Sequence, residues 1–196
     1  MKNATFAALA AAALTLGAAA TAEAQVLTPT FQSPRTGGDI GVYVNDGPGD
    51  LSIEGILRTR RAGYDLGFHV GFADFAEDGS LMLGLDYRNP LSLAGTEPLA
   101  IAFTAGAQAF VGDAEAFGAQ AGLSIGYTFA SPGVSFTPYI HPRIAVINGF
   151  AENDDLDLEP LADVGVDVDL SPRISLRFGA NLGEGADWGI GLAWRR

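Results

Sequence analysis

The stretch from Tyr64 to Phe72 alternates strictly between two kinds of side chain, and it limits the possible folds more than any other part of the sequence. Phe68 belongs to its bulky, apolar set, whereas Asp65 and His69 alternate with glycines. Successive side chains of a β-strand point to opposite faces. In a soluble protein the bulky face would be buried and the glycine-rich face would be turned to water, although glycine weakens a strand and offers no side chain to pack. The pattern therefore indicates a barrel whose bulky face meets lipid and whose small, charged face lines a narrow lumen.

The composition fits an exported β-protein and excludes other classes. The 196 residues include no cysteine, 26 glycines, and 23 acidic against 11 basic residues, for a net charge of −12. This balance excludes a nucleic-acid partner, which needs a basic face. No segment after residue 25 is long and apolar enough for a membrane-spanning helix.

The N-terminus is organised as a cleaved signal peptide. Lys2 precedes an Ala/Leu-rich run, and Ala22 and Ala24 supply the small-x-small cleavage pattern. A retained membrane anchor is the alternative, which the weak hydrophobicity of the run disfavours. The predicted organisation is a cleaved signal peptide at 1–24, an irregular periplasmic lead-in at 25–38 and one barrel domain at 39–196.

Strand-like segments alternate with turn signals along the remaining chain. Ten are predicted, an even number as in single-chain bacterial barrels: 39–45, 50–58, 64–73, 81–88, 99–111, 117–129, 134–147, 161–170, 174–182 and 187–194. Because Pro138 and Pro142 cannot donate to a ladder, the seventh segment is either bulged or shorter than drawn. The predicted fold is an all-β, closed, antiparallel up-and-down transmembrane β-barrel. Its alternative is an eight-stranded barrel with residues 39–58 outside.

Charged side chains recur on the small faces of these segments. A buried charge is costly unless it is paired, so in a narrow barrel we expect a network that fills the lumen. A small pore is the alternative. The predicted lumen network is Glu54, Arg58, Asp65, His69, Asp86, Arg88, His141, Arg143, Asp167 and Arg177, and the same faces carry Asp39, Asp163 and Asp169. With both termini in the periplasm, most arginines fall at the inner end and most acidic residues in the outer connections.

The last segment resembles the C-terminal assembly signal of the bacterial outer-membrane β-barrel family. Asp187, Gly189, Leu192 and Trp194 match its polar, glycine, hydrophobic and aromatic positions, although Arg195 and Arg196 follow here. The resemblance covers residues 39–194 as an architecture and identifies no subfamily. It implies export in a Gram-negative cell and insertion into outer-membrane lipid by the barrel-assembly machinery.

The predicted function is that of a small integral outer-membrane barrel with a structural, surface-interaction or minor porin-like role. One alternative is a soluble exported barrel that binds a hydrophobic ligand, with Phe68 and Phe72 inside. Another is a membrane-embedded hydrolase using His69 or His141, as in a family of ten-stranded outer-membrane proteases whose long outer loops this chain lacks. The sequence has no nucleophile elbow or phosphate-cradling loop, so we predict no catalytic residue and no cofactor. The acidic run 152–159 lacks calcium-loop spacing, and no metal site is predicted.

Overall fold

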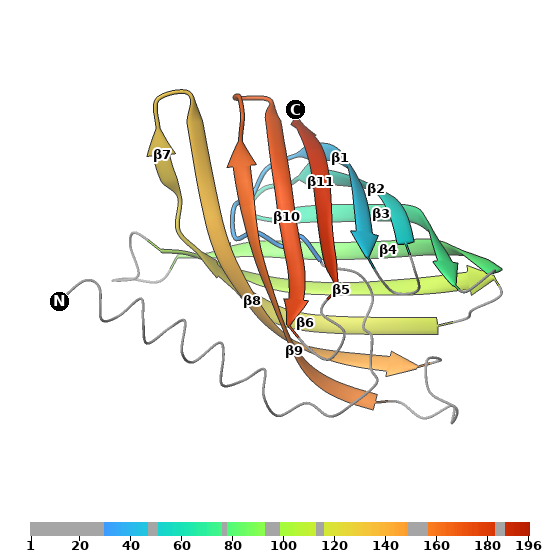
Figure 1. The fold of residues 1–196 in the computed structure, drawn as a ribbon. Coiled ribbons are helices and arrows are strands. Elements are labelled where there is room, and N and C mark those ends of the chain that lie inside the picture. The colour runs from blue at the N-terminus through green and yellow to red at the C-terminus, as the bar shows by residue number, and fades with distance from the viewer. Residues whose placement is uncertain are drawn as a thin grey trace.

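The chain forms a closed, antiparallel β-barrel of ten strands in a computed structural model, which confirms the predicted fold class (Figure 1). The structure describes residues 30–46, 51–75, 78–92, 99–112, 116–148, 157–182 and 187–196. The predicted signal peptide and most of the acidic run lie outside these residues. In the described part, no helix has the length and apolar character needed to cross a membrane.

Ten long strands make the wall, and a short one, β7, extends a hairpin. In chain order they are β1 (Asp39–Asp46), β2 (Leu51–Arg60), β3 (Asp65–Phe75), β4 (Asp78–Leu91), β5 (Ala100–Gly112), β6 (Ala116–Gly126), β7 (Phe129–Ser131), β8 (Val134–Asn148), β9 (Asp157–Asp169), β10 (Ile174–Leu182) and β11 (Trp188–Arg195). β6 pairs with β8, β7 pairs with β8, and β1 pairs with β11, which closes the ring. We call the end where Asp39 pairs with Arg58 and Arg195 the terminal rim.

The structure corrects three details of the strand prediction. The eight-stranded alternative is wrong, because β1 and β2 are part of the closed ring. β8 is neither bulged nor short: its register with β9 runs unbroken, and Pro138 and Pro142 lie on its exposed face. The β6–β8 ladder omits two successive steps, opposite Pro142 and His141, and Pro142 has no N–H to donate. Finally, β9 begins at Asp157, four residues earlier than predicted.

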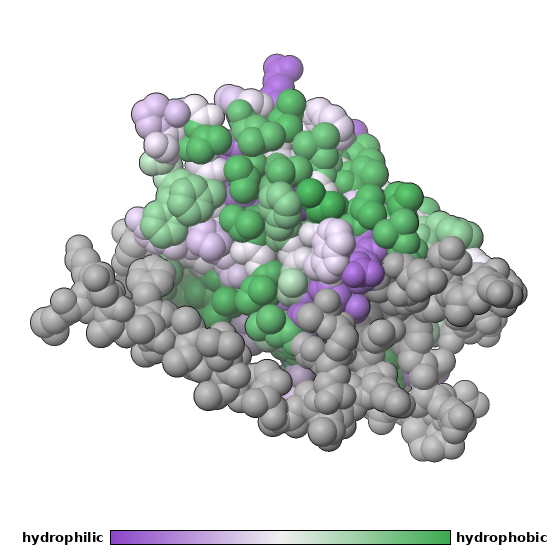
Figure 2. Space-filling model, viewed as in Figure 1, coloured by the Kyte–Doolittle hydropathy of each residue, from purple (hydrophilic) through white to green (hydrophobic). Residues whose placement is uncertain are grey.

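The wall is apolar outside and polar inside. Phe68, Val70 and Phe72 of β3 are 48%, 57% and 56% exposed, whereas Asp65 of the same strand is fully buried. Figure 2 shows hydrophobic side chains over much of the face turned to the viewer. The alternative with Phe68 and Phe72 inside the barrel is therefore wrong.

Glycines on the inner face make room for large side chains. The Tyr43 ring lies across Gly41 and Gly191, and a Cβ added at Gly191 would lie 2.0 Å from Cδ1 of Tyr43. Tyr43 is fully buried, and its hydroxyl accepts hydrogen bonds from Arg58 and Arg177. The ring is thus fixed at both ends, and only glycine fits beneath it.

Substitution of Gly191 by alanine should therefore destabilise the barrel by about 1–3 kcal/mol, the usual cost of overpacking. Urea unfolding in lipid vesicles, followed by tryptophan fluorescence, measures the change. Gly37→Ala is the matched control, because nothing lies within 4 Å of an added Cβ there. Equal unfolding midpoints for Gly191→Ala and the native barrel would contradict this packing.

The segment preceding β1 lies inside the barrel. Phe31 is 1% exposed and packs on Tyr43 with ring centroids 4.5 Å apart. Its φ of 47° lies in the left-handed region, which bulky residues rarely adopt, so packing holds it there. Residues 30–38 form no strand, but Thr30, Gln32 and Ser33 are also buried. The part of the predicted lead-in that the structure describes thus belongs to the filling of the lumen.

Candidate functional site

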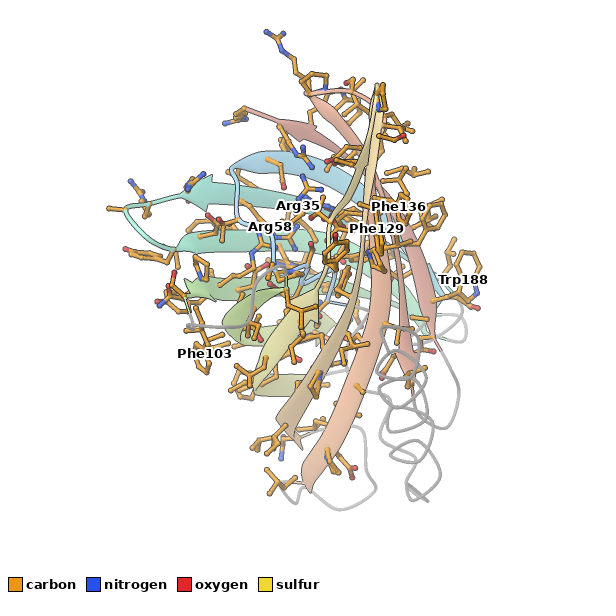
Figure 3. The ribbon with its side chains drawn as sticks, turned by 90° about the vertical axis from the view of Figure 1, so that its left-hand side faces the viewer. Arg35, Arg58, Phe103, Phe129, Phe136 and Trp188 are labelled. Atoms are coloured by element: carbon orange, nitrogen blue, oxygen red, sulfur yellow. The ribbon has the colours of Figure 1, made fainter. Side chains whose placement is uncertain are left out.

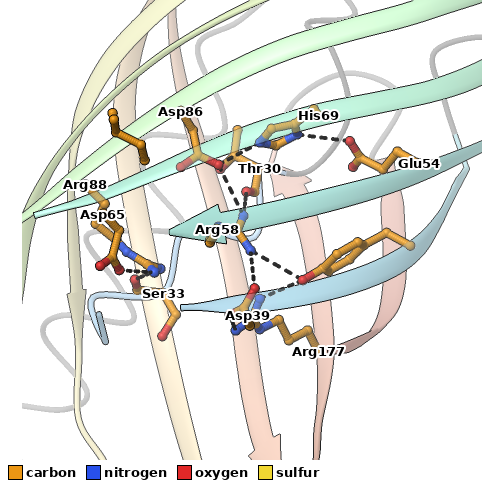
Figure 4. A network of polar contacts seen from close by, with 12 residues as sticks. Thr30, Ser33, Asp39, Glu54, Arg58, Asp65, His69, Asp86, Arg88 and Arg177 are labelled. Atoms are coloured by element: carbon orange, nitrogen blue, oxygen red, sulfur yellow. Dashed lines mark hydrogen bonds and ion pairs between the residues drawn. The ribbon is translucent and has the colours of Figure 1, made fainter. Parts of the chain in front are cut away.

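Arg58 of β2 is the centre of the largest polar group in the lumen (Figure 4). Its guanidinium lies 3.4 Å from the Asp86 carboxylate and 3.9 Å from that of Asp39. Arg177 of β10, which only β11 separates from β1, donates to Asp39 at 2.6 Å and to the Tyr43 hydroxyl at 2.6 Å. Two arginines thus share one carboxylate and one phenol, which ties β1 and β2 to β10.

His69 of β3 extends this group along the lumen. Its Nε2 lies 2.6 Å from Asp86, and its Nδ1 lies 3.1 Å from Glu54. Glu54 also accepts a hydrogen bond from Asn45 at 3.2 Å. A Cβ at Gly67 would meet the Asp86 carboxylate at 2.3 Å, so the glycine is what lets this carboxylate lie flat on the wall.

Arg88 of β4 joins the barrel wall to residues 30–38, which we call the internal segment. It donates to the Asp65 carboxylate at 2.9 Å and to the backbone carbonyl of Ser33 at 2.7 Å. Asp65 in turn accepts from the backbone N–H of Gly37 at 2.8 Å. A strand-to-strand ion pair therefore also binds the chain that runs through the lumen.

A second polar group lies on β5, β8 and β9. Asp163 pairs with Arg143 at 2.9 Å and lies 3.1 Å from Nδ1 of His141. Nε2 of His141 lies 2.7 Å from the hydroxyl of Thr104, and Thr30 donates to Asp163 at 2.7 Å. The order hydroxyl, imidazole, carboxylate is that of a nucleophilic triad. However, Thr104 and His141 are 3% and 1% exposed, which leaves a substrate no access.

Asp169 of β9 gathers a third group at the terminal rim. It pairs with Arg35 at 2.7 Å and with Arg195, and it accepts hydrogen bonds from Ser135 and Ser175. The two arginines lie near opposite ends of the described chain. One carboxylate thus joins the internal segment, β8, β9, β10 and the last residue of β11.

The ten predicted lumen residues all face the interior, and nine of them are buried; His69 is the partly exposed one. Asp167 lies 3.5 Å from Nε of Arg177. Sequence reasoning missed Tyr43, although alternation places it on the same face as Asp39. It also missed Thr30, Ser33 and Arg35, whose irregular segment gives no periodic signal.

The predicted assembly residues lie along β11 and just before it. Gly189 faces inward, Trp194 is 44% exposed on the outer face, and Leu192 shares that face. Asp187 precedes the strand, where burial and then the Asp46 carboxylate raise its pKa to about 6. Recognition of these residues by assembly machinery stays a prediction. Across the described residues, no cluster of three or more His, Cys, Asp or Glu is arranged to hold a metal ion.

Comparison with known proteins gives structural neighbours only. No protein-family model matches the chain, and no curated protein matches it. A bacterial polysaccharide outer membrane secretin matches 79% of this chain and 57% of its own, with 10% identity and a TM-score of 0.48. A KdgM porin matches 81% and 99%, with 8% identity and a TM-score of 0.43. A KdgM porin in complex with disordered oligogalacturonate matches 81% and 98%, with 11% identity and a TM-score of 0.44. This chain therefore spans less than two thirds of the secretin.

Proposed function

We propose that this chain is an integral outer-membrane β-barrel whose lumen is filled, and that it serves a structural or surface-interaction role and not a catalytic one. The observation that carries the proposal is the inverted distribution of polarity across one closed wall. Large apolar side chains are exposed on the outer face of every long strand, while four arginines, Arg58, Arg88, Arg143 and Arg177, are buried inside.

The outer face would be unfavourable in water. Shielding one large apolar side chain from water is worth about 1.5–3 kcal/mol, so a wall of them favours lipid by tens of kcal/mol. Closure supports the same placement, because a ring of paired strands leaves no unpaired edge in hydrocarbon. Aromatic side chains also gather near the rims: Phe103, Phe129 and Phe136 near the terminal rim and Trp188 at the opposite one (Figure 3). Membrane barrels place such girdles at the two interfaces.

The filled lumen favours a structural role over a pore. Near the rim opposite the terminal rim, Ala73, Met82, Phe110 and Ala145 form a buried apolar cluster inside the wall. The charged groups and the buried residues 30–34 lie nearer the terminal rim. We expect these two layers to block a continuous water column. The buried position of His141 and Thr104 likewise opposes hydrolysis.

A spin label at Phe68 tests the membrane placement directly, because the chain has no cysteine and Phe68→Cys can be labelled uniquely. In barrels folded into lipid vesicles, oxygen should relax this label several-fold more strongly than a water-soluble nickel complex, since oxygen concentrates in hydrocarbon. A label at Arg61, exposed in the turn after β2, is the matched control and should show the reverse order. Stronger relaxation of the Phe68 label by nickel would remove the proposal.

A further inference from the structure

An open pocket of about 520 Å³ lies at the terminal rim, between the start of β1 and the ends of β2 and β11. No acidic side chain lines it, although the chain as a whole carries a net charge of −12. Its lining is formed by Arg35, Thr36, Gly37, Gly38, Arg58, Thr59, Arg60, Arg195 and Arg196. Five arginines around one cavity give it the charge that suits an anion.

The acidic partners in contact with these arginines do not neutralise them all. Arg35 and Arg195 share the single carboxylate of Asp169. Arg58 faces carboxylates deeper in the lumen. Arg60 and Arg196 are exposed, and among the described residues neither has an acidic side chain within ion-pair distance. At least two guanidinium groups are therefore free to bind a ligand.

With the membrane placement proposed above, the pocket would lie at the depth of lipid head groups. Trp194, on the outer face of β11, directly precedes Arg195 and Arg196 and is 44% exposed. Tyr64 and Tyr87 lie at the same rim with ring centroids 5.3 Å apart. Tyrosine and tryptophan favour the boundary between hydrocarbon and head groups, so the arginines beyond them lie among the phosphates.

We propose that this pocket binds the phosphate of an anionic phospholipid head group. Arginine presents a planar fork of donors that matches phosphate oxygens, and the volume suits a small ligand. The proposal rests on the membrane function proposed above. It assigns to the terminal rim a preference for anionic over zwitterionic lipid.

Trp194 provides the test once Trp188→Phe leaves it as the single tryptophan. Barrels are folded into phosphatidylcholine vesicles in which brominated phosphatidylglycerol replaces part of the lipid. Quenching of Trp194 fluorescence gives the binding constant of phosphatidylglycerol relative to that of brominated phosphatidylcholine, measured in the same way. One basic residue near an anionic surface is worth about 1 kcal/mol, so we expect a preference of about fivefold or more. Arg60→Gln with Arg196→Gln should bring this ratio close to one.

Arg61→Gln with Arg173→Gln is the matched control, because both arginines are exposed at the same rim but do not line the pocket. This pair should leave the preference unchanged. An equal loss in both pairs would show diffuse surface charge, and no preference in the native protein would show no site; either result overturns the proposal.

Glycerol phosphate added to barrels in pure phosphatidylcholine tests the other phosphate source. Binding of this solute without a lipid preference overturns the lipid assignment. Failure to insert into pure phosphatidylcholine counts instead against the membrane function.

Discussion

Replacement of Arg58 by alanine should lower the free energy of unfolding by about 3–5 kcal/mol, the usual cost of removing one partner from a buried ion pair. The change removes the Arg58 guanidinium from the Asp39 and Asp86 carboxylates, both at most 5% exposed, and leaves Arg177 as the ion-pair partner of Asp39 and His69 as that of Asp86. It also removes the hydrogen bond from Arg58 to Tyr43. Urea unfolding of the barrel in lipid vesicles measures the change.

Two further variants serve as controls for Arg58→Ala. Arg61→Ala removes an exposed arginine next to the same strand and should change the free energy of unfolding by no more than about 0.5 kcal/mol. Asp86→Asn combined with Arg58→Ala should recover part of the loss, because it removes one of the two carboxylate charges that Arg58 faces. A cost for Arg58→Ala no larger than that of Arg61→Ala would show that the lumen is hydrated and the network weak.

Deletion of residues 30–36 should convert a silent barrel into a conducting one. Thr30 and Ser33 accept hydrogen bonds at their carbonyls from Arg58 and Arg88, and the Phe31 ring packs against the wall at Tyr43. Without this segment, water reaches the polar groups that line the terminal half of the lumen. In planar bilayers we expect a flat current trace from the native barrel and discrete conductance steps from the deletion.

A control of equal length separates plugging from general damage. Residues 127–133 include β7 and lie at the terminal rim outside the strands that form the ring, so replacing them with glycine and serine should leave the trace flat. Conductance steps from the native barrel would refute the filled lumen. If the deletion variant conducts no current but still shows heat-modifiable gel migration, the side-chain network alone closes the lumen.

Most of the fold could be predicted because strand alternation is a local signal. The contrast between Phe68 and Asp65 fixes which face is outside, and the same two-residue period assigns the faces of the other strands. The ends of a strand are harder to predict where its terminal residues are of types common in loops. Pro160 and the acids before it read as a turn, yet β9 already pairs with β8 from Asp157 onward.

The filling of the lumen could be predicted only in part. Alternation places Arg58 and Asp86 on the inner face, but it does not say which carboxylate meets which arginine, since that depends on the register of distant strands. Thr30 lies 133 positions before Asp163, its hydrogen-bond partner. No local pattern reports such a contact, so the course of residues 30–38 through the barrel was beyond sequence reasoning.

The internal segment constrains how the barrel is made. Its partners lie on β1, β2, β4, β8 and β9, strands from opposite sides of the wall. The wall is closed only when β11 pairs with β1. We therefore expect this segment to become ordered only after β11 has paired with β1. Protection of Phe31 from a protease would then report that a barrel has finished folding.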